Sequence, residues 1–352
     1  MSYRLESVRD PERFAELAAE WESLASKPAR PFDTYPWYAA WWRAFGGGAA
    51  LEVAAAWSGD RLVAVFPLLR RGRRLAAMAN VHTPVYRPFA ADDEALRAVV
   101  NGVLESGPSA LELPALAVDG EETSELRRGA GAAGLLTTVE RQHVSPIVDT
   151  RGSFEDWREG SKHRWHAPLE RLRRKMLREH EASFSTVESP QDLDAELRAG
   201  FEVEASGWKG RAGTAIVASP ETETFYRELA ERFHDRGELR LSRIVLDGRV
   251  VAFDMCLLSG DRLYLLKTGF DESFRKLAPG LVMRLATIER CFELGLVAHE
   301  LLGDDTEWKR KFSTGERAHE RLNAYSRRPL ALARYEYRAR VRPFLKRLAR
   351  RG

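Results

Sequence analysis

The sequence predicts an α/β protein made of two similar halves, each a mixed, mostly antiparallel sheet flanked by helices. The apolar strand pattern of residues 61–69 returns at residues 249–257, which is 188 positions later. The same shift places the aromatic helical segment of residues 34–45 on residues 222–233, which also have helical periodicity. Two separate segments that share one spacing indicate a duplicated helix, helix, strand, strand unit.

The first half, residues 1–150, begins with clear helix signals. Asp10 suits an N-cap and Pro11 suits the first helical position, where its missing N–H is not needed. An aromatic helix follows and ends at a glycine run. Alternating apolar residues on both sides of the turn at Gly59 then predict a hairpin.

Residues 151–180 form a basic junction between the halves. Four apolar side chains lie on one helical face, and five arginines and two lysines surround it between residues 162 and 178. The apolar positions are Trp165, Leu169, Leu172 and Met176. A contact with phosphate or another polyanion and a solvated linking helix both fit this pattern.

The second half, residues 181–328, predicts a strand, two helices, a hairpin, and then a strand, loop and helix over residues 261–288. A final segment, residues 329–352, predicts a basic helix with apolar positions. This helix could dock on the domain, or it could make peripheral contact with a membrane surface or an anionic polymer.

Composition narrows the class of protein. Lysine and arginine number 55 against 52 acidic residues, so the net charge is only +3 and local basic patches matter more than the total. Cys256 and Cys291 lie in apolar stretches, which favours reduced thiols. The sequence has no apolar run of membrane-spanning length and no apolar core near its start, so we expect a soluble, cytoplasmic protein. The eight histidines lack metal-ligand spacing, so we expect no metal.

The loop before the helix of residues 281–288 has the features of a phosphate site. Arg275 and Lys276 supply positive charge, Pro279 suits the first helical turn, and Gly280 lets a ligand approach a helix start with unpaired N–H groups. The spacing Arg275-x-x-Ala278-x-Gly280 resembles the pyrophosphate loop of GNAT-fold acyltransferases, in which glycine usually stands where this chain has Ala278. A basic turn before an ordinary helix is the other interpretation.

Further motifs extend the resemblance along nearly the whole chain. Residues 204–215 read EASGWKGRAGTA, residues 269–280 read GFDESFRKLAPG, and residues 300–312 read ELLGDDTEWKRKF. Together they resemble a bacterial group of GNAT-fold N-acyltransferases associated with cellulose and exopolysaccharide synthesis, akin to Fem-type transferases with two tandem GNAT-like halves. The resemblance implies an acyl-CoA donor and an amine acceptor, commonly on a sugar. The shifted counterpart of the loop, residues 87–92, has no glycine, so only the second half is expected to keep the cofactor loop.

Acyl transfer to an amine needs a proton acceptor, an oxyanion donor and a proton for the leaving group. Glu204 is our first candidate base and Asp304 the second, although a surface carboxylate is the alternative for Glu204. A backbone N–H on the strand of residues 264–269 is the expected oxyanion donor, and Tyr264 is the candidate acid for the thiolate. Lys309 resembles a lysine that Fem-type enzymes keep near the reacting ester.

The remaining candidates bind rather than react. Lys267, Thr268 and Gly269 precede the loop and are expected to face the donor. Trp208 and Lys209 suit a sugar-stacking platform with a cation for an acceptor phosphate, although core packing is the common role of a tryptophan.

These features predict an N-acyltransferase that moves an acyl group, most simply acetyl, from acyl-CoA to an amine of a sugar or sugar-linked intermediate in surface polysaccharide synthesis. Two alternatives stay open: a Fem-like transferase that uses aminoacyl-tRNA, and a catalytically degenerate GNAT scaffold that binds or regulates. The acceptor, the acyl chain length and the oligomeric state are not specified by the sequence.

Overall fold

The computed structural model describes residues 3–25, 30–160, 165–188 and 190–349, with the backbone alone for residues 346–349. The chain forms two compact units, each assembled from separate stretches of sequence. Unit 1 consists of Met1–Trp42, Gly46–Val144 and Arg317–Gly352, and unit 2 consists of Arg43–Phe45 and Ser145–Glu316. Residues after 316 therefore belong to the first unit. The ranges predicted from the sequence are consecutive and place residues up to 328 in the second half.

Unit 1 is a mixed sheet with helices. Its elements are β1 (Arg4–Val8), α1 (Pro11–Glu16), α2 (Ala18–Leu24), η1 (Pro31–Asp33), α3 (Tyr35–Phe45), β2 (Ala50–Ser58), β3 (Arg61–Arg71), β4 (Arg74–Ala77), β5 (Phe89–Ala90), α4 (Asp93–Glu105), β6 (Ala110–Ala117), α5 (Glu121–Ala132), β7 (Leu136–Asp149), β13 (Gly315–Tyr325), α13 (Pro329–Glu336), η4 (Tyr337–Val341) and α14 (Arg342–Ala349). The strand order is β1-β2-β3-β4-β6-β13-β7, and β5 pairs with β3.

Unit 2 has the same architecture. Its elements are α6 (Phe154–Gly160), α7 (His166–Glu179), β8 (Ala182–Val187), α8 (Leu193–Ser206), α9 (Trp208–Arg211), η2 (Ile216–Ala218), α10 (Pro220–Asp235), β9 (Leu239–Leu246), β10 (Arg249–Ser259), β11 (Arg262–Phe270), η3 (Glu272–Leu277), α11 (Pro279–Glu293), β12 (Ala298–Glu300) and α12 (Glu307–Phe312). The strand order is β12-β11-β10-β9-β8, with the end of β7 beside β12.

The predicted duplication is confirmed by strand bounds and register. Strands β3 and β10 begin and end 188 positions apart. The parallel pair of unit 1 sets Arg74 opposite Ala110, and the parallel pair of unit 2 sets Arg262 opposite Ala298, again 188 positions apart. In both halves this parallel pairing lasts for three residue pairs.

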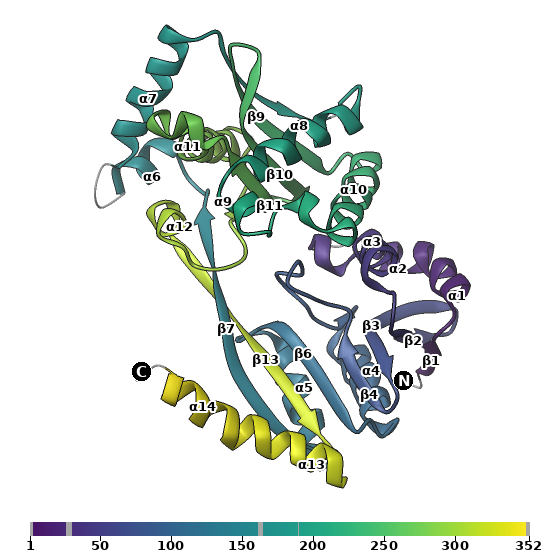
Figure 1. Ribbon diagram of the computed structural model, residues 1–352. Coiled ribbons are helices and arrows are strands. Elements are labelled where there is room, and N and C mark those ends of the chain that lie inside the picture. Colours follow the sequence, from purple (N-terminus) through teal and green to yellow (C-terminus); the bar gives the residue numbers. More distant parts are fainter. Residues whose placement is uncertain (1–2, 26–29, 161–164, 189, 350–352) are drawn as a thin grey trace. The chain divides into compact units, whose positions relative to one another are not determined.

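Helices cover both faces of the unit 2 sheet (Figure 1). Helices α7 and α11 pack against one core, and the four apolar positions predicted for the junction helix all belong to it or pack against it. Helix α8 packs closely on β10. A Cβ built on Gly200 of α8 would lie only 2.3 Å from the Phe253 ring of β10. The glycine therefore allows the helix to sit directly on the strand.

Two arginines of the basic junction are paired within unit 2. Arg173 forms an ion pair with Glu289 of α11 at 2.7 Å, and Arg158 forms one with Glu170 at 3.0 Å. Arg171 and Arg174 are exposed on α7. Part of the predicted basic stretch, residues 161–164, lies outside the described residues. The pairs tie the helix to its own unit, and the contact with a polyanion stays a prediction.

The helix expected to open at Gly280 begins one residue earlier, at Pro279. In unit 1 the shifted residues 87–92 include strand β5, in which Phe89 and Ala90 pair with β3, and they lead into α4. In the part of the chain that is described, no helix has both the length and the apolarity to cross a bilayer.

Candidate active site in unit 2

Strands β11 and β12 separate in the middle of unit 2. Their parallel pairing ends at Tyr264 and Glu300, while β11 continues to Phe270. After β12, Leu302 and Gly303 both adopt left-handed backbone conformations, with φ of 48° and 57°. Two successive residues of this kind turn the chain away from the strand direction, so residues 265–270 of β11 lose their parallel partner.

A β-bulge in β11 lies at this separation. Leu265 pairs with Cys256 of β10 and Lys267 pairs with Met255, which leaves Leu266 without a register partner on β10. A bulged residue does not use its backbone groups in the regular ladder. The predicted oxyanion stretch, residues 264–269, therefore contains one residue, Leu266, outside the regular register with β10.

The predicted donor loop leads directly into α11. It forms η3 and ends at Ala278, which has φ 46° and ψ 50° and is the N-cap of α11. A non-glycine residue in this conformation costs roughly 1–2 kcal/mol. This cost explains why glycine is usual at this position in the pyrophosphate-loop pattern. Arg275 and Lys276 are exposed beside the helix start, and the first turn of α11 has neither an acidic residue nor a side-chain cap.

Glu204 lies inside the unit rather than on the surface of α8. It is 2% exposed, one carboxylate oxygen accepts from Lys209 Nζ at 2.9 Å, and the other accepts from the Ile216 N–H at 2.9 Å. The surface alternative for this residue is wrong. Both oxygens are occupied, so the arrangement is that of a buried counter-ion for Lys209.

Lys209 joins the helical region to β11. Its Nζ donates to the carbonyl of Thr268 at 2.7 Å in addition to Glu204. The backbones approach closely here, because a Cβ on Gly269 would lie 2.5 Å from the Glu204 Cα. Thr268 and Gly269 are thus fixed by packing and by the hydrogen bond from the Lys209 side chain to the Thr268 carbonyl.

Trp208 is 58% exposed at the start of α9, so the core-packing alternative is wrong for it. Its backbone N–H donates to Glu272 Oε1 at 2.9 Å, and Arg211 forms an ion pair with the same carboxylate at 2.8 Å. Glu272 therefore ties α9 to the donor loop. Glu272 was not among the residues predicted from the sequence.

Lys267 is a partly buried lysine on the bulged part of β11. Its Nζ lies 4.6 Å from the ring centroid of Tyr226 on α10. Burial lowers the pKa of Lys267 to about 8, and the nearby Lys209 ammonium acts in the same direction while Glu204 opposes it. Tyr226 was not among the residues predicted from the sequence, and as a cation–π partner it stabilises the protonated form.

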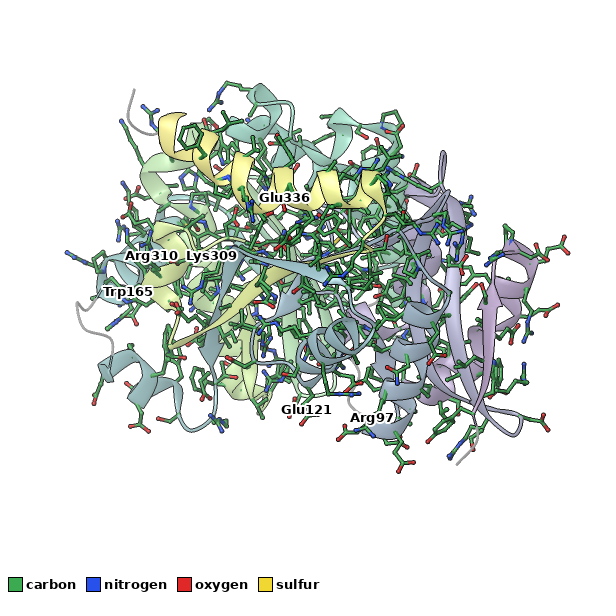
Figure 2. The ribbon with its side chains drawn as sticks, turned by 90° about the horizontal axis from the view of Figure 1, so that it is seen from below. Arg97, Glu121, Trp165, Lys309, Arg310 and Glu336 are labelled. Atoms are coloured by element: carbon green, nitrogen blue, oxygen red, sulfur yellow. The ribbon has the colours of Figure 1, made fainter. Side chains whose placement is uncertain are left out.

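Lys309 approaches from α12, where Figure 2 labels it beside Arg310. Its Nζ donates to the carbonyl of Leu302, in the left-handed turn after β12. Burial lowers the pKa of Lys309 to about 8, the nearby carboxylate of Asp304 raises it, and Lys209 lowers it. Asp304 itself is exposed.

The predicted residues therefore fall into two groups. Lys209, Lys267 and Lys309 form a lysine cluster, since the first lowers the pKa of each of the others. Arg275, Lys276, Ala278 and Gly280 lie at the helix start. Tyr264 is buried in β11 at the last position paired with β12, so it lies at the point of separation.

A buried ionic triad anchors α11 and was not predicted. Arg284 of α11 donates to Asp254 of β10 at 2.6 Å and to His299 of β12 at 2.7 Å. All three are fully buried or nearly so, and burial together with the arginine charge lowers the pKa of His299 to about 3. His299 is therefore neutral and accepts a hydrogen bond from Arg284. The triad fixes α11 to strands β10 and β12.

Among the residues the structure describes, no group of three or more histidine, cysteine or acidic side chains could hold a metal ion.

Comparisons with known proteins bear on the fold. Residues 162–310 match the acetyltransferase (GNAT) domain family. A search of curated proteins finds no match. The fold is similar to FemX, with a TM-score of 0.59, 12% identity, and coverage of 91% of this chain and 97% of that one.

Two further structures share the fold. L-PGS from Bacillus licheniformis has a TM-score of 0.57 and 13% identity, with coverage of 92% of this chain and 95% of that one. The C-terminal domain (DUF2156) of a protein described as a lysylphosphatidylglycerol synthetase from Agrobacterium fabrum has a TM-score of 0.58 and 14% identity, with coverage of 91% and 94%. At these identities the likeness shows the fold alone.

The match of residues 162–310 to the acetyltransferase (GNAT) domain family supports an acyltransferase, and the α/β fold consists of two tandem halves.

Proposed function

We propose that unit 2 transfers an acyl group, acetyl in the simplest case, from acyl-CoA to an amine of a sugar or sugar-linked intermediate in surface polysaccharide synthesis. The observation that carries the proposal is the start of α11. There an uncapped helix N-terminus, the left-handed Ala278 and the exposed Arg275 and Lys276 come together. Backbone N–H groups and cations of this kind suit a diphosphate.

In the proposed reaction a neutral amine attacks the thioester carbonyl and its proton passes to a base. The Leu266 N–H is the candidate oxyanion donor, because the bulge removes it from the ladder with β10. Asp304 is exposed and close to Lys309, which supports it as the direct base. Glu204 would then act by holding Lys209, or through water.

The leaving thiolate needs a proton or a positive charge. Tyr264 is a candidate acid because of its place where the strands separate. Lys267 and Lys309 are further candidates, since a pKa of about 8 lets an ammonium release a proton near neutral pH. Trp208 is exposed and offers a face on which a sugar ring could stack.

Calorimetric titration with acetyl-CoA tests the donor. The wild type should bind, and the Arg275→Ala, Lys276→Ala variant should bind at least ten-fold more weakly. A matched control, Lys175→Ala with Arg178→Ala, removes the same charge from α7 and should bind like the wild type. If neither acetyl-CoA nor CoA binds the wild type, the acyl-CoA proposal is wrong.

A second assay follows the release of free CoA thiol in the presence of amino sugars and simple amines. Turnover with an amino sugar is expected, and it should fall when Asp304 is replaced by Asn. Binding of acetyl-CoA without turnover by any of these amines would instead favour a binding or regulatory protein.

An aminoacyl-tRNA is the second candidate donor, and the fold shared with FemX favours it. The lysine cluster could then bind the ester-linked aminoacyl group. This alternative predicts that charged tRNA binds with an affinity that falls steeply with salt, and that acetyl-CoA does not bind.

A further inference from the structure

We propose that the last helical segment, residues 329–349, is a docking surface for the anionic face of a lipid bilayer. Helices α13 and α14 are joined through η4 into one continuous segment (Figure 1). The wide η4 turn precedes Pro343, which has no N–H to continue an α-helical ladder. From residue 329 to residue 352 the sequence holds eight arginines and lysines and a single acid, Glu336 (Figure 2).

One side of this segment is fixed to unit 1. The rings of Tyr335 and Tyr325 lie 6.1 Å apart, edge to face. Arg342 and Arg338 both pair with Glu140, at 2.5 Å and 3.7 Å. These contacts hold the helix in one rotation about its axis, so its remaining surface is presented in a defined way.

The remaining surface is apolar to an unusual degree. Leu330 is 81% exposed, Tyr337 51%, Val341 45%, Phe344 61% and Leu345 49%. Tyr337, Val341 and Leu345 recur every four residues, and none of them belongs to the set that contacts unit 1. Single exposed apolar side chains are common, but several along one helix mark an interaction surface.

Cations flank the apolar residues. Arg334 and Arg340 are exposed on the helix, and Arg327 and Arg328 are exposed just before it. Long basic side chains can place their charge among lipid phosphates while the apolar residues enter the acyl boundary. An anionic bilayer offers phosphates for the basic side chains and acyl chains for the apolar ones. We therefore favour a bilayer over two other partners.

An RNA backbone would pair with the arginines but has no apolar layer for Leu330, Phe344 and Leu345. A second copy of the chain would bring an equally basic helix against this one, and the two would repel. Docking on lipid is independent of which donor unit 2 uses, so its failure would leave the proposed function untouched.

The test is flotation of the full chain with vesicles of phosphatidylcholine, with and without about one third phosphatidylglycerol. The wild type should float with the anionic vesicles and remain behind with phosphatidylcholine alone. Phe344→Asp with Leu345→Asp should reduce the bound fraction at least ten-fold, and Arg334→Gln with Arg340→Gln should reduce it several-fold at moderate salt.

The matched control is Val81→Asp with Leu294→Asp, which adds the same charge at exposed apolar positions elsewhere, 94% and 46% exposed in the wild type. It should float like the wild type, and circular dichroism should show that all variants are folded. Equal flotation of the 344/345 variant and this control would overturn the proposal. Absence of vesicle binding by the wild type would also overturn the proposal. Loss of RNA binding in the arginine variant would then indicate RNA as the partner, and loss of self-association in the 344/345 variant would indicate a second copy of the chain.

Discussion

The two halves have matching strands up to the end of the parallel strand pair, and they differ in the segment that follows it. In unit 1, β4 ends at Ala77, and residues 78–88 leave the sheet. Tyr86 in that stretch donates its N–H to the carbonyl of Ala115 on β6 at 3.0 Å. In unit 2, β11 runs on past its bulge to Phe270, and the corresponding chain forms the loop before α11. In unit 1 the segment after β4 thus supplies a backbone hydrogen bond to β6.

The helix starts differ in charge. In unit 1 the Asp92 carboxylate caps α4 by accepting from the Ala95 N–H at 2.8 Å, and Asp93 and Glu94 follow in the first turn. The first turn of α11 has no acid and no side-chain cap. A helix N-terminus attracts anions, so the carboxylates of α4 already supply the negative charge that α11 leaves for a ligand.

The cores differ at matching positions. Where unit 2 has its buried ionic triad, the positions 188 residues earlier are apolar and buried, namely Phe66, Leu96 and Leu111. The same backbone arrangement therefore accepts either an apolar core or a paired ionic one. The comparison suggests that the fold needs filled volume at these sites, and that the charges in unit 2 serve the position of α11.

The largest expected effect comes from breaking the triad. Arg284→Leu should lower the free energy of unfolding by about 3–5 kcal/mol, because it leaves the Asp254 carboxylate buried without its partner. Denaturant unfolding measures this change. The triple variant Asp254→Phe, Arg284→Leu, His299→Leu imports the residues of unit 1 and should recover most of the loss. A cost below about 1 kcal/mol for Arg284→Leu alone would contradict the assigned role.

The second prediction gives α11 the charge of α4. Gly280→Asp should weaken acetyl-CoA binding roughly 100-fold, about 2.7 kcal/mol, because the new carboxylate repels a diphosphate at the helix start. Calorimetry measures the affinity. Gly280→Ala is the control for bulk, since a Cβ there lies 3.2 Å from the Phe270 ring and needs only a small shift. Equal losses in the two variants would show that size rather than charge is responsible.

The third prediction concerns the partly buried ammonium of Lys267. Its folded pKa of about 8 lies below the ordinary lysine value of 10.5, so the unfolded chain binds more protons between these values and stability should rise with pH across that window. Below pH 8 the full penalty is present. Lys267→Met should therefore be more stable than the wild type by about 2 kcal/mol at pH 7, with the difference closing toward pH 10.5.

Thermal unfolding from pH 7 to 10.5 measures this dependence. The control is Lys311→Met, which removes an exposed lysine from α12 and should give a curve parallel to the wild type. A constant difference between Lys267→Met and the wild type at every pH would mean that packing, rather than charge burial, sets the effect.

The smallest effect separates strain from function. Ala278→Gly and Ala115→Gly each relieve a left-handed alanine, with φ of 46° and 56°, and each should gain roughly 0.5–1 kcal/mol after the higher entropy of the unfolded glycine chain is counted. Chemical unfolding measures both. Only Ala278→Gly should also change acetyl-CoA affinity, since Ala115 lies in unit 1. A change in affinity with Ala115→Gly would contradict the assignment of the donor site to unit 2.

The sequence by itself determined the duplication and the position of the loop before α11. Apolar periodicity and a constant spacing depend on local chain chemistry, so the strands of both halves and the helix after Pro279 could be located without coordinates. The departure of Ala278 from the glycine pattern was also visible, and its left-handed backbone gives the reason that a glycine is usual there.

Only the tertiary structure decided how the charges are paired. Whether Glu204 faces water or Lys209, and whether Trp208 is buried or exposed, depends on which elements meet across the unit, and helical periodicity carries no such information. The triad joins residues on β10, α11 and β12 that are distant in sequence. The return of residues 317–352 to unit 1 follows from strand pairing between distant segments, which residue pattern alone does not reveal.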